Sequence, residues 1–116
     1  MKAQDHETPK RTHLANFNIA GFSYWDGCEA FEQLQIGTEL KLVRETGNAF
    51  DFYAVAIYFG DFKLGYVPRE ENHEISKYLD MGLENIYECR VTRLTPDTHP
   101  ENQVAVIVYV KNQKLQ

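Results

Sequence analysis

Cysteine is scarce in this chain: two residues, Cys28 and Cys89, lie far apart and form no Cys-x-x-Cys pair. Small secreted domains held by disulfides and structural zinc sites both need paired cysteines at short spacing, so the sequence disfavours both and favours a reducing compartment. The four histidines are scattered and do not supply the missing metal ligands. We therefore expect neither a metal nor any other cofactor.

Long apolar runs are also lacking. No stretch approaches the roughly 18 apolar residues of a membrane-spanning helix. Residues 1–14 mix basic with acidic side chains and have no apolar run, so they do not read as a signal peptide. The sequence predicts a cytoplasmic protein with no membrane partner.

Positive charge is in deficit. Lys and Arg number 12 against 17 Asp and Glu, which gives a formal net charge of -5. A field of this sign repels polyanions and cannot supply the sequence-independent affinity of a protein that coats DNA. Any role with nucleic acid must therefore depend on a local site.

The sequence is rich in aromatic residues, at 13%, and 43% of it is hydrophobic, which is typical of a globular chain with many strands. Its 116 residues suit one domain. We expect a flexible tail at residues 1–13, the domain at 14–111 and a short tail at 112–116. No internal repeat divides the chain.

Hydrophobic patterns predict six strands, near residues 14–22 and at 38–45, 54–59, 62–67, 85–94 and 103–110. Only Gly60-Asp61 separates the third strand from the fourth, so these two should form an antiparallel hairpin. Short helices are expected at 28–34 and 72–83. The predicted fold class is mainly β with short helices, as a small OB-like antiparallel barrel of about six strands.

Three motif blocks add a resemblance. Residues 19–27 read Ile-Ala-Gly-Phe-Ser-Tyr-Trp-Asp-Gly, residues 40–57 contain Gly-Asn-Ala-Phe-Asp between two strands, and residues 64–69 read Leu-Gly-Tyr-Val-Pro-Arg. In this order and spacing they resemble the HIRAN family, here a stand-alone bacterial-type member, over about residues 15–110. The resemblance implies an OB-like barrel. In helicases of the SWI/SNF class that remodel replication forks, this domain captures the 3′ end of single-stranded DNA.

Carried over by position, the resemblance implies that Tyr24 stacks on a terminal base with Trp25 beside it. Asp51 would accept a hydrogen bond from the 3′ hydroxyl, next to the aromatic Phe50. Apart from the resemblance, Tyr66 follows Gly65 at a strand end and is a candidate to line the same pocket, and the cations on neighbouring strands or just beyond them are candidates for phosphate contacts. The candidate DNA-binding residues are Ser23, Tyr24, Trp25, Phe50, Asp51, Lys63, Tyr66 and Arg69, and Lys41 and Arg44 are further candidates for phosphate contacts.

The chain also departs from the family pattern. Ser23 stands where some DNA-binding members have Arg, Ala49 where Pro is common, and Tyr53 where Asn is usual. Phe50 lacks the hydroxyl of the usual Tyr. These departures concern the pocket more than the fold.

Each candidate has a purely structural alternative. Tyr24 and Trp25 would alternate on a strand, so that one of them faces the core. Asp51 would cap its own loop, and Tyr66 would be a core tyrosine. Catalysis has no support, since no spacing pairs Cys28 with a histidine as nucleophile and base, and no catalytic residue is assigned.

Two functions follow. The first is a non-catalytic module that binds a free 3′ end of single-stranded DNA in repair, replication or mobile-element biology, with DNA ends and a helicase or nuclease as partners. The alternative is a protein-interaction adaptor that keeps the barrel and has lost DNA binding. The retained Tyr24, Phe50 and Asp51 favour the first, and the negative charge and the departures favour the second. The oligomeric state stays open.

Overall fold

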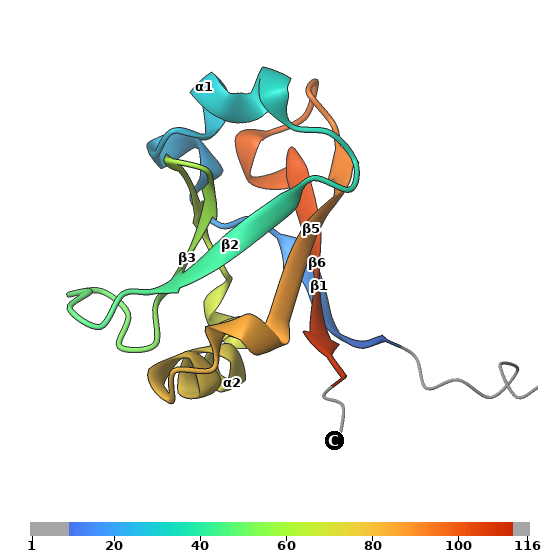
Figure 1. Ribbon diagram of the computed structural model, residues 1–116. Coiled ribbons are helices and arrows are strands. Elements are labelled where there is room, and N and C mark those ends of the chain that lie inside the picture. The colour runs from blue at the N-terminus through green and yellow to red at the C-terminus, as the bar shows by residue number, and fades with distance from the viewer. Residues whose placement is uncertain (1–9, 113–116) are drawn as a thin grey trace, which may run out of the picture.

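The computed structural model describes residues 10–112, which form six strands and two α-helices (Figure 1). The strands are β1 (Arg11–Asn18), β2 (Glu39–Arg44), β3 (Val55–Phe59), β4 (Phe62–Tyr66), β5 (Tyr87–Leu94) and β6 (Val104–Lys111). The helices are α1 (Gly27–Ala30) and α2 (Arg69–Asp80), and 3-10 turns lie at Phe22–Tyr24, Phe31–Gln33, Glu84–Ile86 and Pro100–Asn102. The mainly β class with two short helices is thus confirmed.

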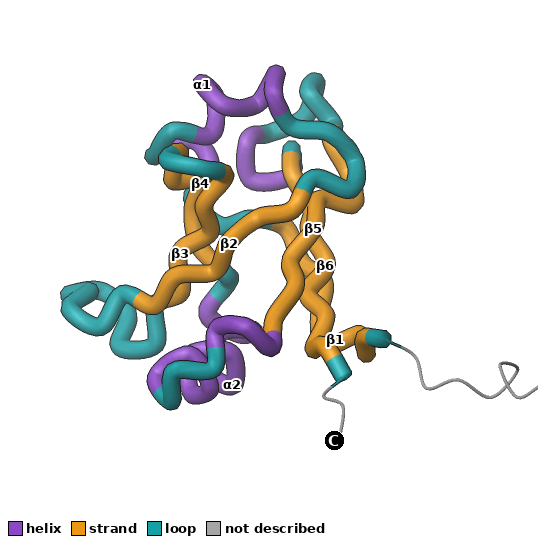
Figure 2. Tube along the Cα trace, in the orientation of Figure 1, coloured by secondary structure: helices purple, strands orange, loops and turns teal. Residues whose placement is uncertain are grey.

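The strands form one antiparallel sheet in the order β1-β6-β5-β2-β3-β4. β2 joins its two halves: Glu39 and Leu40 pair with β5, whereas the rest of the strand, from Lys41 to Arg44, pairs with β3. The sheet therefore bends at β2, which crosses from the β5 side to the β3 side (Figure 2). The core lies between the two halves.

The expected barrel is wrong, because the sheet is not closed. Closure would need a ladder between the edge strands β1 and β4. β1 ends at Asn18, and only one bridge follows, in which the backbone N–H groups of Ala20 and Tyr66 each donate to the other's carbonyl at 2.9 and 2.8 Å. The chain then turns at Gly21, whose φ is 71°, and within residues 10–112 no ladder with β4 follows; only the hydrogen bonds between Asp26 and Lys63 join the two segments again. Gly65 allows the bridge, since a Cβ there, at φ 144°, would overlap the Ala20 carbonyl.

Apolar side chains from both halves fill the core, and burial of each large one contributes about 1.5–3 kcal/mol. Fully buried members include Ile19, Phe22, Val55, Ile57, Leu64, Val67, Ile75, Val91, Val106 and Val108. α1 and α2 cover opposite ends of this core (Figure 1). α2 does so with a stripe that includes Ile75 and Leu79. None of the helices in residues 10–112 is long and apolar enough to cross a membrane.

Several local boundaries differ from the expected ones. β1 begins at Arg11, ahead of the start expected near Leu14, and the remaining parts of the two expected tails, residues 1–9 and 113–116, lie outside the described residues. α2 begins at Arg69, three residues early, with Pro68 as its N-cap; the Pro68 carbonyl accepts a hydrogen bond from the Glu71 N–H at 2.9 Å. The hairpin of β3 and β4 is confirmed.

Candidate functional site

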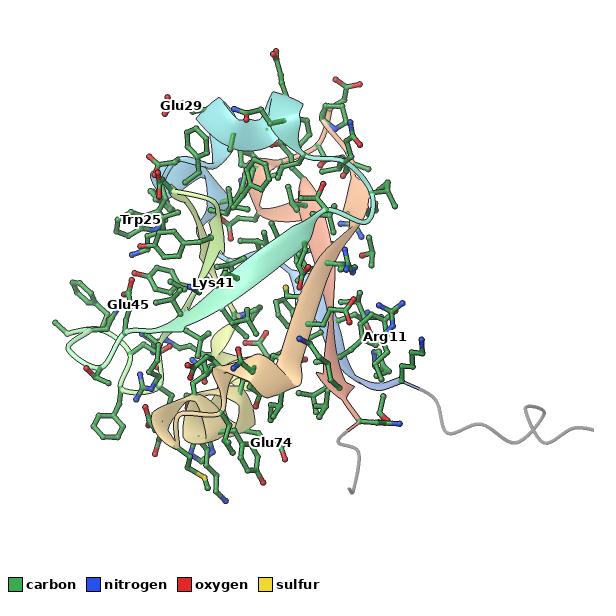
Figure 3. The ribbon with its side chains drawn as sticks, viewed as in Figure 1. Arg11, Trp25, Glu29, Lys41, Glu45 and Glu74 are labelled. Atoms are coloured by element: carbon green, nitrogen blue, oxygen red, sulfur yellow. The ribbon has the colours of Figure 1, made fainter. Side chains whose placement is uncertain are left out.

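A pocket of about 250 Å³ opens where the bridge at Ala20 and Tyr66 meets the loop at residues 45–54 and the start of α2. Its lining residues are Ala20, Gly21, Trp25, Asn48, Phe50, Asp51, Ala54, Tyr66, Val67 and Arg69. Trp25 and Glu45 point to the same side of the molecule, beside the end of β2 that is remote from β5 (Figure 3). Three segments far apart in sequence therefore build one concave surface.

An aromatic wall stands on one side of the pocket. The rings of Trp25 and Tyr66 meet edge to face, with their centroids 5.9 Å apart. The Nζ of Lys63 lies 3.7 Å from the centroid of the Trp25 ring, a cation–π contact. Asp26 fixes this segment to β4, because its backbone N–H donates to the Lys63 carbonyl at 2.8 Å and its Oδ2 accepts from the Lys63 N–H at 3.1 Å. Trp25 is thus held against β4 from two sides.

A hydrogen-bonded group lies behind this wall. Lys63 Nζ donates to Glu45 Oε2 at 2.6 Å and to the Tyr66 hydroxyl at 2.7 Å, and that hydroxyl donates to Glu45 Oε1 at 2.8 Å. Asn48 Nδ2 donates to Glu45 Oε1 at 3.2 Å. The charge of Lys63 is therefore balanced inside the protein.

Burial and pairing shift the pKa values of this group. Burial alone would raise the pKa of Glu45, but hydrogen bonds from Lys63, Tyr66 and Asn48 outweigh it and hold that pKa below its ordinary value. Burial would lower the pKa of Lys63, and its bonds to Glu45 and Tyr66 raise it instead. Burial raises the pKa of the Tyr66 hydroxyl. At neutral pH the group is an ion pair joined to a neutral phenol.

A β-bulge explains how Lys63 and Tyr66 can act together. Side chains three residues apart in a regular strand point to opposite faces. In β4, however, Lys63 pairs with Tyr58 and Gly65 with Ile57, so Leu64 is an extra residue. The bulge restores Tyr66 to the face that carries Lys63, while Leu64 enters the core.

Asp51 is fixed in the loop by its neighbours. Its Oδ1 accepts from the Tyr53 backbone N–H at 3.0 Å, which is the Asx turn expected of an aspartate there. Its Oδ2 accepts from the side-chain amide of Asn72 at 2.8 Å. Asn48 Oδ1 in turn accepts from the N–H groups of Phe50 and Asp51 at 2.8 and 3.0 Å. The carboxylate consequently has a defined orientation at the pocket.

Two arginines donate hydrogen bonds to backbone carbonyls of the same loop. Arg69 donates to the Phe50 carbonyl and lies with Nε 3.8 Å from Asp51 Oδ2. Arg44, largely buried, donates to the carbonyls of Ala54 at 3.0 Å and Phe52 at 2.8 Å, and to Asp80 of α2 at 2.9 Å. The guanidinium of Arg44 is thus occupied by hydrogen bonds to the loop backbone, whereas that of Arg69 is exposed at the pocket rim.

The structure brings together Trp25, Phe50, Asp51, Tyr66 and Arg69 as pocket-lining residues, with Lys63 behind Trp25. Ser23 and Tyr24 do not line the pocket. The strand expected there is replaced by the 3-10 turn, so Tyr24 and Trp25 do not alternate between core and solvent and are 81% and 46% exposed. Tyr24 lies beside Gly21, at the edge of the pocket.

Sequence reasoning missed Glu45, Asn48 and Asn72 as site residues. Asn72 could have been found from the sequence. It precedes Ile75 by three residues and Leu79 by seven, so it lies on the same face of the helix as these apolar residues, where another apolar residue is expected. It is 2% exposed. Glu45 carried no such signal, because Lys63 and Tyr66, which bind its carboxylate, come from β4. Within residues 10–112, no group of three or more His, Cys, Asp or Glu could hold a metal ion.

Comparison with known proteins identifies the fold. Residues 13–112 match the family model of the HIRAN domain, which confirms the resemblance inferred from the motifs. Among solved structures, the chain is similar to a Lactobacillus plantarum protein whose crystal structure was determined by a structural genomics consortium. The two are 24% identical, the match covers 86% of this chain and 94% of the other, and the TM-score is 0.72. This likeness concerns the fold alone. No curated protein matches the chain.

Proposed function

The chain belongs to the HIRAN domain family, which is generally associated with DNA binding and whose domains are typically non-catalytic, and we propose that it binds the free 3′ end of single-stranded DNA. The pocket beside Asp51 holds the terminal nucleotide. Replication, repair or mobile-element biology supplies such ends, and a helicase or nuclease is the protein partner.

The observation that carries this proposal is the oriented carboxylate of Asp51 in the pocket. A carboxylate has about four lone-pair sites and donates no proton when ionised, and two of these sites are taken by Tyr53 and Asn72. The remaining sites accept from a hydroxyl. They repel a phosphate, whose oxygens are also negative. Such a group discriminates a free 3′ hydroxyl from a phosphorylated or continuing strand.

Aromatic surface for the terminal base is present in the pocket, at Phe50, and at its edge, at Tyr24. Phe50, 86% exposed, and Tyr24 each present a ring that no other ring covers within residues 10–112. Trp25 already has one face against Lys63 and serves as the inner wall. A stacked base is worth about 1–3 kcal/mol, so one or two such contacts suit a weak and local interaction.

Charge at the pocket suits an acidic protein. Glu45 balances Lys63, and Asp51 lies against Arg69, so the site carries no excess positive charge. Arg69 is exposed and can turn its guanidinium toward the phosphate on the 5′ side of the terminal nucleotide. Affinity therefore depends on the chain end and weakly on salt, unlike that of a basic DNA-coating protein.

The test compares two short single strands of one sequence, one with a 3′ hydroxyl and one with a 3′ phosphate, by fluorescence anisotropy with the label at the 5′ end. Wild-type protein should bind the hydroxyl strand more tightly. Asp51→Asn keeps an oxygen for the Tyr53 N–H but removes the charge, so it should bind the two strands with nearly equal affinity. Equal or absent binding of both strands by the wild type would overturn the proposal.

A second candidate function, the protein-interaction adaptor, is favoured by one observation. Phe52 is 73% exposed outside the pocket, and its ring meets Tyr53, which in turn meets His73 of α2 with the centroids 4.1 Å apart. Exposed aromatic patches of this kind often mark protein contacts. Absence of DNA binding together with loss of a protein partner in Phe52→Ala would favour this function.

A further inference from the structure

A row of three side chains crosses the half-sheet beside the pocket. Lys41 of β2 pairs in register with Tyr58 of β3, and Tyr58 pairs with Lys63 of β4. Directly opposed residues share a face of the sheet, so the three side chains stand together on its outer face. Trp25 covers Lys63, so one end of the row touches the aromatic wall of the pocket.

Beyond the phosphate that Arg69 meets, two routes lead away from the pocket for a strand whose 3′ end occupies it. The first passes Arg69 into a neighbouring cavity of about 410 Å³, which shares Ala20 and Arg69 with the pocket. That cavity is also lined by Glu70, Glu71 and Glu101, so carboxylates would face the phosphates of the next nucleotides. Repulsion disfavours this route.

The second route runs along the row. Lys41 is exposed, and no salt bridge joins it to a carboxylate within residues 10–112. Lys63 is different, since Glu45 already balances its charge. Tyr58 is half-buried and lies between the two lysines. From β4 to β2 is two strand spacings, about 10 Å, which is within reach of the nucleotides that follow the terminal one.

We propose that single-stranded DNA leaves the pocket across the outer face of β4, β3 and β2, with a base against Tyr58 and a phosphate on Lys41. This inference rests on the proposed function and adds a second subsite to it. The row ends at a further cavity of about 400 Å³, which Lys41 and Tyr58 both line where β2 separates from β5. Glu39 and Glu84 also line this cavity, but Lys41 and Lys111 match them in number, whereas carboxylates outnumber cations in the cavity of the first route.

The experiment varies strand length and salt. Lys41→Gln and the control Lys77→Gln, an exposed lysine on α2 beside Glu70 and Glu74, are titrated with a 3′-hydroxyl octamer and with a dinucleotide. For the octamer, Lys41→Gln should make the slope of log K against log salt shallower by about 0.7, the loss of one phosphate contact. Tyr58→Leu should weaken octamer binding on the order of tenfold. Dinucleotide binding should be unchanged in both variants.

The outcomes separate the subsite from the function beneath it. If the wild type prefers the 3′ hydroxyl but Lys41→Gln behaves like Lys77→Gln on the octamer, the route across the sheet is wrong and the pocket remains. Equal weakening of dinucleotide and octamer by Lys41→Gln would also overturn the route, because it would assign Lys41 to the pocket. If the wild type binds neither the 3′-hydroxyl octamer nor the dinucleotide, the proposed function is wrong and the proposed subsite is wrong with it.

Discussion

Replacement of Gly65 by alanine tests how the bridge between β4 and the end of β1 holds the site. An added Cβ would overlap the carbonyl oxygen of Ala20 and lie 2.7 Å from the Cγ2 of Ile19. Neither can move freely, since one is backbone and the other is a fully buried side chain. The backbone φ of 144° at Gly65 is also one that other residues rarely adopt.

The magnitude follows from these terms. Overpacking in a filled interior costs about 1–3 kcal/mol, and an unfavourable φ costs roughly 1–3 kcal/mol. Separation of the strands to relieve the overlap would instead break the two backbone hydrogen bonds between Ala20 and Tyr66, worth about 0.5–1.5 kcal/mol each. If the strands separate, the overlap is relieved but the hydrogen bonds are lost, so the variant cannot escape a cost. We expect Gly65→Ala to lower the free energy of unfolding by about 3–5 kcal/mol.

Urea denaturation followed by tryptophan fluorescence measures this change, and Trp25 is the single reporter. A domain of this size has about 5–15 kcal/mol of stability, so part of it should remain in the variant. Gly47→Ala is the matched control, because a Cβ there meets nothing within 4 Å and φ at Gly47 is not positive. A loss in Gly65→Ala within about 1 kcal/mol of the control would refute the reasoning.

Two further predictions concern the site. Since the pKa of Glu45 is lowered by folding, its carboxylate contributes stability that is present above the ordinary value of 4.5 and lost as pH falls through the folded value. In urea denaturation, Glu45→Gln should therefore be less stable than the wild type at neutral pH, and its stability should fall less as the pH is lowered. Identical profiles of stability against pH for the two proteins would contradict this. Asn72→Leu removes a hydrogen bond to the Asp51 carboxylate and should cost about 1.5–3 kcal/mol in the same assay. If the loss of stability comes from the hydrogen bond between Asn72 and Asp51, Asn72→Leu should cost less stability when Asp51 is already replaced by Asn. Losses of stability that simply add in the double variant would contradict this explanation.

Local signals predicted most of the elements, because each is encoded within a few neighbouring residues. The turn at Gly60-Asp61 between two apolar runs correctly gave the hairpin of β3 and β4. The aromatic pair was different, since Gly21 turns the chain into a 3-10 helix and Tyr24 and Trp25 do not alternate as strand residues. The barrel was wrong for a related reason, because strand count does not reveal where an edge strand stops pairing.

The candidate site was predicted in part. Motif resemblance selected Trp25, Phe50 and Asp51, and position at the end of the fourth strand or just beyond it added Tyr66 and Arg69. The fold brings all five to one pocket. Glu45 could not be found this way, since it gains its role only when β2 and β4 lie on either side of β3. Register between strands distant in sequence has no local signal, and the same holds for the row from Lys41 to Lys63.

The extra residue at Leu64 makes β4 tolerant of a change in length at one position. Deletion of Leu64 would remove the bulge and leave Lys63 and Tyr66 two residues apart in a regular strand, where they would still share a face. The cost would fall on the core, which would lack the buried Leu64 side chain. Deletion of one residue within the neighbouring strand β3 would instead turn every side chain that follows to the other face. A relative that is one residue shorter at this point of β4 can therefore keep the same pocket wall.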